Sequence, residues 1–272
     1  MLLGYHTNTW GGVVGHPAGV TSVKDLYYLT PGSTEQALRE IAAVGYQGFE
    51  LFDGNLMAYE PKKDAFRSLI QETGLKFLAV YSGANFIFPE ILPEELWRIA
   101  QTAALAAELG AEHLVVGGGA IRVAGVREDD YDRLAEGLNQ VVGIAKRHGL
   151  TASYHPHHGT IVETPAQIDK IMSRTLIGFC PDTGHILEGG GDPVKLIGTY
   201  GHRIPYVHLK DYGDGDFRPL GRGQVDLWGV VEALGAIGYN GWITVELDSY
   251  AGPPKEAAEL AWQYLEQGKP AQ

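Results

Sequence analysis

The second half of the chain contains four short apolar runs, and each ends in a residue that can bind a metal ion. They read Thr151-Ala-Ser-Tyr-His155, Ile177-Gly-Phe-Cys-Pro-Asp182, Ile204-Pro-Tyr-Val-His208 and Trp242-Ile-Thr-Val-Glu246. The runs have the length and composition of buried strands, and helical patterns lie between them. In a parallel α/β barrel the carboxyl ends of the strands meet at one mouth, where active sites sit. The pattern therefore predicts that two histidines, an aspartate and a glutamate converge there on a divalent metal.

Strand-like and helix-like segments alternate along the whole sequence. The expected strands cover residues 2–5, 48–52, 76–81, 113–116, 151–155, 177–180, 204–209 and 242–247. The expected helices cover residues 35–44, 62–73, 93–109, 128–148, 165–173, 193–200, 227–234 and 254–267, and Thr34 is the expected N-cap of the first. Eight strand–helix units predict a single-domain (β/α)8 TIM barrel over residues 1–272. The alternative is an open, doubly wound sheet, but no Gly-x-Gly-x-x-Gly joins a strand to a helix. Gly117-Gly-Gly119 lacks that spacing and favours a flexible loop.

The bulk composition narrows the class of protein. A length of 272 residues is usual for one barrel, and the formal net charge of −12 argues against binding a nucleic-acid backbone. The one cysteine, Cys180, allows no internal disulfide and is interpreted as a buried small hydrophobe. The N-terminus shows no basic segment before a long apolar stretch, and no apolar run has the length of a membrane span. We therefore expect a cytoplasmic protein without membrane contact.

The richest chemistry lies in Tyr154-His155-Pro-His157-His158-Gly-Thr160. Three histidines within four residues are unusual in a core, and neutral imidazole is a common metal ligand. Strand alternation places His155 and His157 on one side, although Pro156 can break the pairing there. An exposed histidine-rich loop is the alternative interpretation.

The other three runs each carry a structural interpretation beside the functional one. Asp182 in Asp182-Thr-Gly-His185 can be a helix cap, while Gly184 would allow a sharp turn that returns His185 to the mouth. A strand histidine such as His208 is often a core residue. Glu246 ends an apolar strand, where an unpaired carboxylate is costly, which favours a functional role. Mixed nitrogen and oxygen ligands suit Mn²⁺, Co²⁺, Zn²⁺ or Mg²⁺ and do not choose among them.

Together these motifs resemble the xylose-isomerase-like TIM-barrel superfamily, which includes sugar isomerases and epimerases, AP endonuclease family 2 and the inosose (2-keto-myo-inositol) dehydratases. The motifs that carry the resemblance are Tyr154-His-Pro-His-His-Gly-Thr160, Asp182-Thr-Gly-His185, His202-Arg-Ile-Pro-Tyr-Val-His208-Leu-Lys-Asp211 and Gly238-Tyr-Asn-Gly-Trp-Ile-Thr-Val-Glu246. The superfamily pattern spans the whole chain, and the dehydratase-like signature covers it from about residue 148 onward.

The resemblance implies a metal held by His155, Asp182, His208 and Glu246, with Mn²⁺ or Co²⁺ expected and Zn²⁺ or Mg²⁺ as alternatives. Epimerases and isomerases typically carry glutamate at the first of these positions. His155 therefore favours the dehydratase branch. The implied reaction is enolate chemistry on a keto-polyol or keto-sugar, in which a metal acts as a Lewis acid.

The resemblance also implies residues for proton transfer and for substrate binding. The acid and base candidates are Glu246, His157 and His185, and the sequence does not assign their roles. The candidates for substrate contact are Glu50, Lys210, Arg218, Asn8 and Trp10, with ion pairing, solvation or packing as the structural alternatives. Two long loops, residues 11–32 and 211–226, are expected to form lids or substrate walls.

Three other functions fit parts of the pattern. An isomerase or epimerase of a keto-sugar would use the same metal site. A DNA-repair endonuclease would need further histidines on earlier strands, whereas the third strand here ends at Tyr81-Ser82. A non-catalytic metal- or sugar-binding barrel would hold metal without turnover. Members of the superfamily are often dimers or tetramers, so a homo-oligomer is a further expectation.

Overall fold

Eight parallel strands form the central sheet of the computed structural model, which describes residues 2–11, 27–248 and 250–268. Their order is β6-β5-β4-β3-β2-β1-β10-β7. The bounds are β1 Leu2–His6, β2 Gly48–Phe52, β3 Lys76–Ala84, β4 His113–Gly118, β5 Thr151–Tyr154, β6 Gly178–Phe179, β7 Val207–Leu209 and β10 Trp242–Val245. Strands that follow one another in this set lie side by side, as a repeated strand–helix unit requires. The predicted (β/α)8 barrel is confirmed.

The barrel closes between β6 and β7, the two ends of this sheet order. Asp182 and His208 form a parallel bridge there, and the His208 N–H donates to the Pro181 carbonyl oxygen at 3.0 Å. Two residues of the predicted metal site therefore make the closing contact of the barrel.

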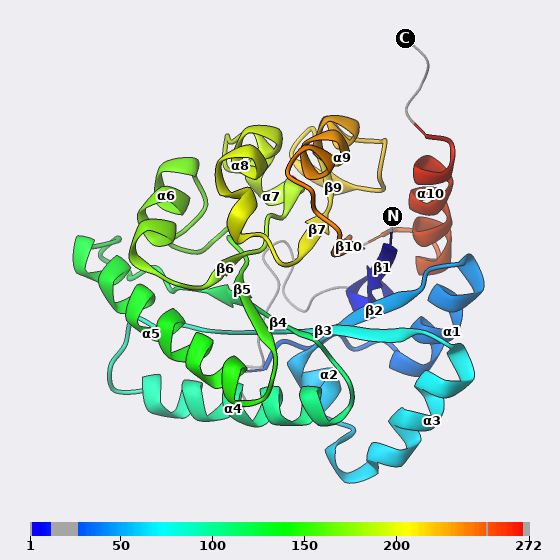
Figure 1. The fold of residues 1–272 in the computed structure, drawn as a ribbon, viewed down its shortest axis with the longest axis horizontal. Helices are drawn as coiled ribbons and strands as arrows, with labels where there is room; N and C mark the ends of the chain where they lie inside the picture. The colour runs from blue at the N-terminus through cyan, green and yellow to red at the C-terminus, as the bar shows by residue number, and fades with distance from the viewer. Residues whose placement is uncertain (1, 12–26, 249, 269–272) are drawn as a thin grey trace.

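Helices surround the strands, as Figure 1 shows. The helices are α1 Thr34–Val44, α2 Asp53–Met57, α3 Lys63–Thr73, α4 Leu92–Glu108, α5 Glu128–Arg147, α6 Pro165–Arg174, α7 Thr183–Glu188, α8 Pro193–Tyr200, α9 Leu227–Ala236 and α10 Pro254–Glu266. Short 3₁₀ turns are η1 Thr7–Trp10, η2 Glu60–Lys62 and η3 Gly201–Arg203. The last helix packs beside the first, where the rings of Tyr46 and Trp262 lie 5.0 Å apart between centroids. This contact joins the ends of the repeat.

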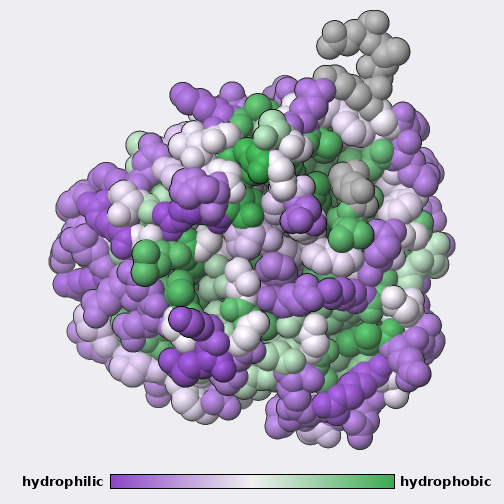
Figure 2. Space-filling model, in the orientation of Figure 1, coloured by the Kyte–Doolittle hydropathy of each residue, from purple (hydrophilic) through white to green (hydrophobic). Residues whose placement is uncertain are grey.

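Hydrophilic side chains cover most of the rim of the face shown in Figure 2, over the outer helices. Hydrophobic side chains gather in smaller areas nearer its middle. Within the described ranges, no helix combines the length and apolar character that crossing a bilayer requires.

The structure differs from the sequence expectation in its short elements. Helix α1 begins at Thr34 and its N-cap is Ser33, whose hydroxyl accepts from the Gln36 N–H, so the expected cap was wrong by one residue. Helices α2 and α7 have five and six residues, too few to show a helical period in the sequence. They were not predicted for that reason.

The structure describes one of the two long loops that were predicted to form lids or substrate walls, and only the ends of the other. Most of the expected lid at residues 11–32 falls on residues 12–26, outside the described residues. The 211–226 segment contains an antiparallel hairpin, β8 Asp211–Gly213 and β9 Asp216–Arg218. The buried Asp211 carboxylate accepts four backbone N–H groups of this segment, at 2.8 to 3.1 Å. One side chain therefore fixes the shape of the loop.

The glycines at 117–119 serve close packing rather than the flexibility expected from the sequence. Gly117 and Gly118 belong to β4. A Cβ on Gly117 would lie 1.9 Å from the Tyr81 hydroxyl oxygen, and a Cβ on Gly118 would lie 2.1 Å from the Ala84 carbonyl oxygen. The absence of side chains lets β3 and its tyrosine approach β4.

Leu78 of β3 occupies a space left by two other glycines. A Cβ on Gly4 would lie 2.6 Å from Leu78, and a Cβ on Gly48 would lie 2.7 Å from it. Leu78 is fully buried in a cluster that also contains Cys180, which is buried as predicted. Small residues on β1 and β2 therefore leave space for a large side chain from β3 in the barrel interior.

We predict that Gly48→Ala lowers the free energy of unfolding by about 1–3 kcal/mol, because the added methyl group overpacks Leu78. Gly198→Ala is the matched control. Gly198 lies in α8, and no described atom comes within 4 Å of the added methyl group. The better helix propensity of alanine should stabilise that variant by about 0.5–1 kcal/mol. Urea unfolding measures both changes, and equal stability of Gly48→Ala and wild type would contradict the packing argument.

Candidate metal centre and active site

Each predicted metal ligand lies at the carboxyl end of a barrel strand. His155 follows β5, Asp182 lies beyond β6, His208 lies within β7 and Glu246 follows β10. All four are buried, and one potential ligand atom from each lies within 4.8 Å of the others. The structure therefore brings together the four residues that the sequence singled out. We call them the ligand cluster.

The distances show side chains directed at a common point. His155 Nε2 lies 3.2 Å from Asp182 Oδ2 and 3.9 Å from Glu246 Oε2, and His208 Nδ1 lies 2.6 Å from Glu246 Oε2. Among the described residues, neither His208 Nδ1 nor Glu246 Oε2 has a hydrogen bond of normal geometry. Buried polar atoms without such partners are costly, and imidazole nitrogen with carboxylate oxygen is a suitable donor set for a divalent metal. The residues present therefore fit a metal ion.

The charge around the cluster also favours a cation. Four buried carboxyl groups lie here, those of Glu50, Asp182, Glu246 and Asp248. Buried Lys210 faces three of them: its Nζ lies 3.1 Å from Asp248 Oδ1 and 3.4 Å from oxygens of Asp182 and Glu246. Burial lowers the pKa of Lys210, but these carboxylates outweigh it and raise the pKa above its usual value. One lysine does not balance four acids, and a bound dication would offset the surplus.

His208 sits between two of these carboxylates. Its Nε2 lies 2.8 Å from Glu50 Oε2, on the side away from Glu246. Burial pulls the pKa of His208 down, but the charges of Glu50, Cys180 and Glu246 outweigh it and raise the pKa well above its usual value. Positive charge is therefore favoured at this position.

The two carboxylate oxygens of Asp182 make different contacts. Its Oδ1 accepts the His185 N–H at 2.9 Å and caps α7, which leaves Oδ2 facing His155. The sharp turn expected at Gly184 is wrong, because this residue lies inside α7. A Cβ there would lie 2.8 Å from Lys210 Cγ, so the glycine allows the lysine to reach the cluster.

His157 and His185 lie in contact beside the cluster, with ring centroids 3.9 Å apart and ring planes tilted by 42°. His157 Nδ1 lies 2.7 Å from the His158 carbonyl oxygen, so the ring donates from Nδ1 and its Nε2 carries the lone pair. Burial, with the nearby charges of His155 and Lys210, lowers the pKa of His157 to about 3. The ring is therefore neutral at ordinary pH.

His185 has partners at both ring nitrogens. Its Nδ1 lies 3.3 Å from Glu188 Oε2, and its Nε2 lies 3.3 Å from Lys210 Nζ. Burial, followed by the charges of His157 and Lys210, lowers its pKa well below the usual value. Because Lys210 donates to Nε2, this ring is neutral as well.

The expected substrate-binding residues separate into two groups. Asn8 Nδ2 donates to Glu246 Oε1 at 3.1 Å, so Asn8, like Glu50 and Lys210, lies in contact with the ligand cluster. Trp10 and Arg218 do not share these contacts.

The contacts of Trp10 and Arg218 are local. Trp10 packs edge-on against Tyr5, and its indole N–H donates to Glu40 of α1. Arg218 donates to the Gly213 carbonyl oxygen at 3.0 Å and pairs with Asp214 at 3.4 Å, within its own hairpin. Within the described residues, no hydrogen bond or ion pair joins either side chain to the ligand cluster, and their role in substrate binding stays a prediction.

Two residues that the sequence analysis did not name lie at the site. Asp248 accepts from Lys210 and from Asn8, and its position two residues after Glu246 could have indicated the same side of the chain. The Phe217 ring lies 4.7 Å from Lys210 Nζ and 4.7 Å from the His185 ring. No sequence signal separates Phe217 from other loop aromatics.

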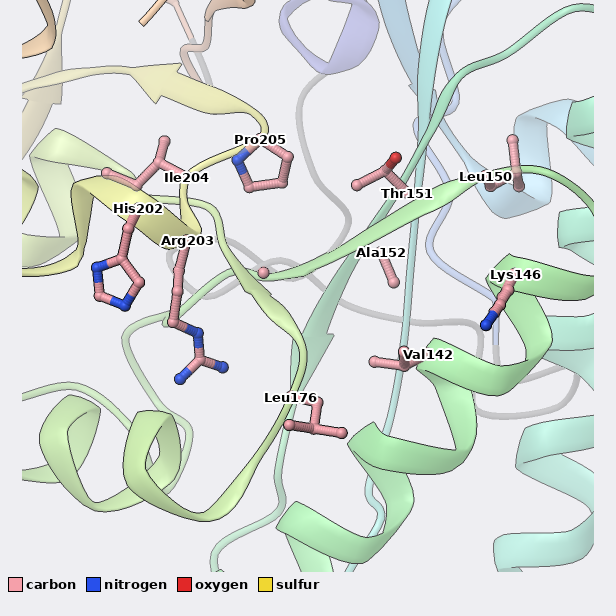
Figure 3. Close-up of a pocket in the computed structure, with 11 residues that line it drawn as sticks. Val142, Lys146, Leu150, Thr151, Ala152, Leu176, His202, Arg203, Ile204 and Pro205 are labelled. Carbon is pink, nitrogen blue, oxygen red and sulfur yellow. The ribbon is translucent and has the colours of Figure 1, made fainter. Parts of the chain in front are cut away.

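A second cavity, of about 410 Å³, lies at the other end of the strands (Figure 3). Its lining includes Thr151 and Gly178, which begin β5 and β6, with Lys146 on one side and His202 and Arg203 on the other. Arg203 donates to backbone carbonyl groups near α6, which is a structural role. Because TIM-barrel chemistry takes place at the carboxyl ends of strands, the ligand cluster and not this cavity is the candidate active site.

Two curated relatives are similar to this chain along most of its length. Inosose dehydratase from Geobacillus kaustophilus (strain HTA426) is 30% identical over 269 residues, which cover 85% of this chain and 86% of that protein. Inosose dehydratase from Lacticaseibacillus casei is 30% identical over 268 residues, covering 85% and 88%. These relatives align along most of both chains.

The fold has solved counterparts. The structure of 3-keto-D-glucoside 4-epimerase, YcjR, from E. coli matches with a TM-score of 0.74 and 18% identity, covering 98% of this chain and 99% of that one. The family model described as xylose isomerase-like TIM barrel matches residues 38–267. The chain belongs to the xylose isomerase-like TIM-barrel family.

Proposed function

We propose that this protein is a divalent-metal-dependent lyase that removes water from a cyclic polyol ketone, with 2-keto-myo-inositol as the substrate to test. The observation that carries the proposal is the ligand cluster with His155, rather than a glutamate, at its first position. Two curated relatives named inosose dehydratase, each 30% identical along most of the chain, support the same reaction.

The reaction needs a cation and a base. A divalent metal held by His155, Asp182, His208 and Glu246 supplies Lewis-acid stabilisation of the negative charge that develops beside a ketone when a proton leaves. Mn²⁺ or Co²⁺ is the metal that we propose, on the resemblance to the dehydratases; the mixed imidazole and carboxylate donor set suits Zn²⁺ and Mg²⁺ as well.

His157 is the residue that we propose as the base. Its Nε2 has a free lone pair, because Nδ1 donates to a backbone carbonyl oxygen. Both oxygens of Glu246 face other groups: Oε1 faces Asn8 and Lys210, and Oε2 faces His208. Glu246 therefore acts as a ligand, and the base role is left to the histidines.

Proton balance requires no outside acid. His157 takes the proton from the carbon beside the ketone. The C–O bond on the next carbon then breaks, and His157 gives the same proton to the departing hydroxyl group, which leaves as water. Beside this path, Lys210 donates to His185 and to the Asp248 carboxylate. Since His185 is already engaged at both nitrogens, its role here is positional.

A sugar epimerase is the second candidate, because it would use the same cluster. In an epimerisation, the neighbouring hydroxyl group is retained. A proton returned to the other face of the same carbon then inverts the configuration of that carbon. The solved relative named 3-keto-D-glucoside 4-epimerase has this barrel, which supports the alternative at the level of fold. The expected dimer or tetramer stays a prediction.

The direct test of the proposed function is a pair of assays on protein loaded with Mn²⁺ or Co²⁺. We expect 2-keto-myo-inositol to lose water and give a dione, detected by mass spectrometry as a loss of 18 Da, the mass of one water molecule. Ketohexoses should show no C3 epimerisation by NMR. Epimerisation without dehydration would replace the lyase with the second candidate, and metal binding without either reaction would indicate a non-catalytic barrel.

We predict that Glu246→Gln weakens metal binding by more than about 100-fold, because it removes a negatively charged ligand. In wild type, Mn²⁺ at about 100 times its Kd should raise the free energy of unfolding by about 2.7 kcal/mol. The variant should show no such rise at the same concentration. Elemental analysis and urea unfolding measure these effects. Glu95→Gln is the control, because Glu95 is equally buried but bonds to the backbone at residues 85 and 86.

We predict that His157→Asn lowers kcat by about 10²- to 10⁴-fold while the metal content stays at the wild-type level, as expected for loss of a general base. His158→Asn is the matched control, since its side chain pairs with Glu163 and Glu188 and faces solvent. Steady-state kinetics with parallel elemental analysis distinguish the two. A His157→Asn enzyme with near-normal kcat would remove His157 from the mechanism.

A further inference from the structure

Glu50 reaches across the barrel to a predicted metal ligand. It lies on β2, and β1 and β10 separate that strand from β7, which carries His208. The two side chains meet inside the barrel, with Glu50 Oε2 at 2.8 Å from His208 Nε2. Both are 0% exposed to solvent.

This contact fixes which nitrogen of His208 faces the cluster. A carboxylate only accepts hydrogen bonds, so His208 Nε2 carries the hydrogen that Glu50 accepts. The nitrogen left to bind a cation is Nδ1, which lies 2.6 Å from Glu246 Oε2. The orientation of the ring and its proton position therefore both follow from Glu50.

The other oxygen of Glu50 faces β1, and it has no hydrogen-bond partner among the described residues. His6 Nδ1 accepts the Asn8 N–H at 3.0 Å, so in the neutral His6 ring the hydrogen lies on Nε2, 4.0 Å from Glu50 Oε1. The Asn8 side chain donates to Glu246. One short segment of β1 and η1 thus adjoins both the ligand cluster and the group behind it.

We propose that Glu50 is a positioning residue that holds His208 with Nδ1 toward the metal and strengthens that nitrogen as a ligand. This role rests on the metal site of the proposed function, and it replaces the substrate contact expected from the sequence. Carboxylate–histidine–metal arrangements are common, and loss of the outer partner typically costs about 10- to 100-fold in metal affinity. The competing explanation is that the pair only stabilises the folded barrel.

The test uses chelator-treated full-length protein titrated with Mn²⁺ in a calorimeter. Glu50→Gln keeps the size of the side chain and an oxygen that can accept from Nε2, but it removes the charge. We expect its Kd for Mn²⁺ to rise by about 10- to 100-fold. The melting temperature in chelator reports separately any loss of stability from breaking the buried Glu50–His208 pair. The visible spectrum of the Co²⁺ form should also change, since the ligand geometry loosens.

Two further variants serve as a substitute and as a control in the Mn²⁺ titration. Glu50→Asp retains the charge but is one methylene shorter, so it should also raise the Kd for Mn²⁺. It replaces Glu50→Gln in the titration if that variant does not fold. Glu95→Gln, which alters a buried acid on α4, should lower the melting temperature and leave the Kd for Mn²⁺ unchanged.

The outcomes separate this inference from the proposed function. If wild type binds Mn²⁺ and the folded Glu50 variants bind it with the same Kd, the positioning role is overturned while the metal site stands. A fall in melting temperature without a change in Kd would establish the purely structural explanation. If wild type binds neither Mn²⁺ nor Co²⁺, the proposed function itself fails.

Discussion

The contact that closes the barrel is the constraint on which the rest of the structure depends. Eight strands form a barrel only if the first and last members of the sheet order meet, and here β6 meets β7 through Asp182 and His208. The two strands are among the shortest of the sheet, with two and three residues, and Thr183 adds hydrogen bonds across this seam to the backbone of Lys210. Because both residues belong to the ligand cluster, completing the fold and assembling the site are the same structural event.

Burying carboxylates at this seam costs free energy. A small residue and one lysine nearby reduce that cost. Gly184 leaves space for the Lys210 stem, and Lys210 then faces Asp182, Glu246 and Asp248. An uncompensated buried carboxylate would cost several kcal/mol, so a single lysine limits the cost without removing it. The residual negative charge gives the apo protein a site that attracts a cation. The same charge makes the site less stable without one, which links the metal to the stability of the fold.

The sequence predicts the parts of this arrangement that follow from strand periodicity. The barrel and the four ligands could be predicted because each ligand ends an apolar run, and parallel strands share one open end. The link from Glu50 to His208 could not, because it depends on which strands face each other across the interior. Trp10 and Arg218 follow the right strands, but bonds to Glu40 and to Gly213 determine where they point. Phe217 belongs to a hairpin whose shape comes from a single carboxylate, that of Asp211, and no periodic pattern signals that kind of control.

The mouth of the barrel is asymmetric, and this asymmetry bears on the chemistry. Asp182, Lys210, Glu246 and Asp248 lie at the ends of β6, β7 and β10, and Glu50 is the charged residue from β2. The strands β1 to β3 also contribute a wall of rings: His6 lies 4.7 Å from Phe52, and Tyr81 lies 5.3 Å from His155, between centroids. Buried rings lower the local dielectric, so each charge on the opposite side acts more strongly than it would in water. Stabilising an enolate requires fixed charge in a place where solvent cannot screen it. In the proposed reaction, the aromatic wall would act without transferring a proton, by preserving the strength of the charges of His155, Asp182, His208 and Glu246.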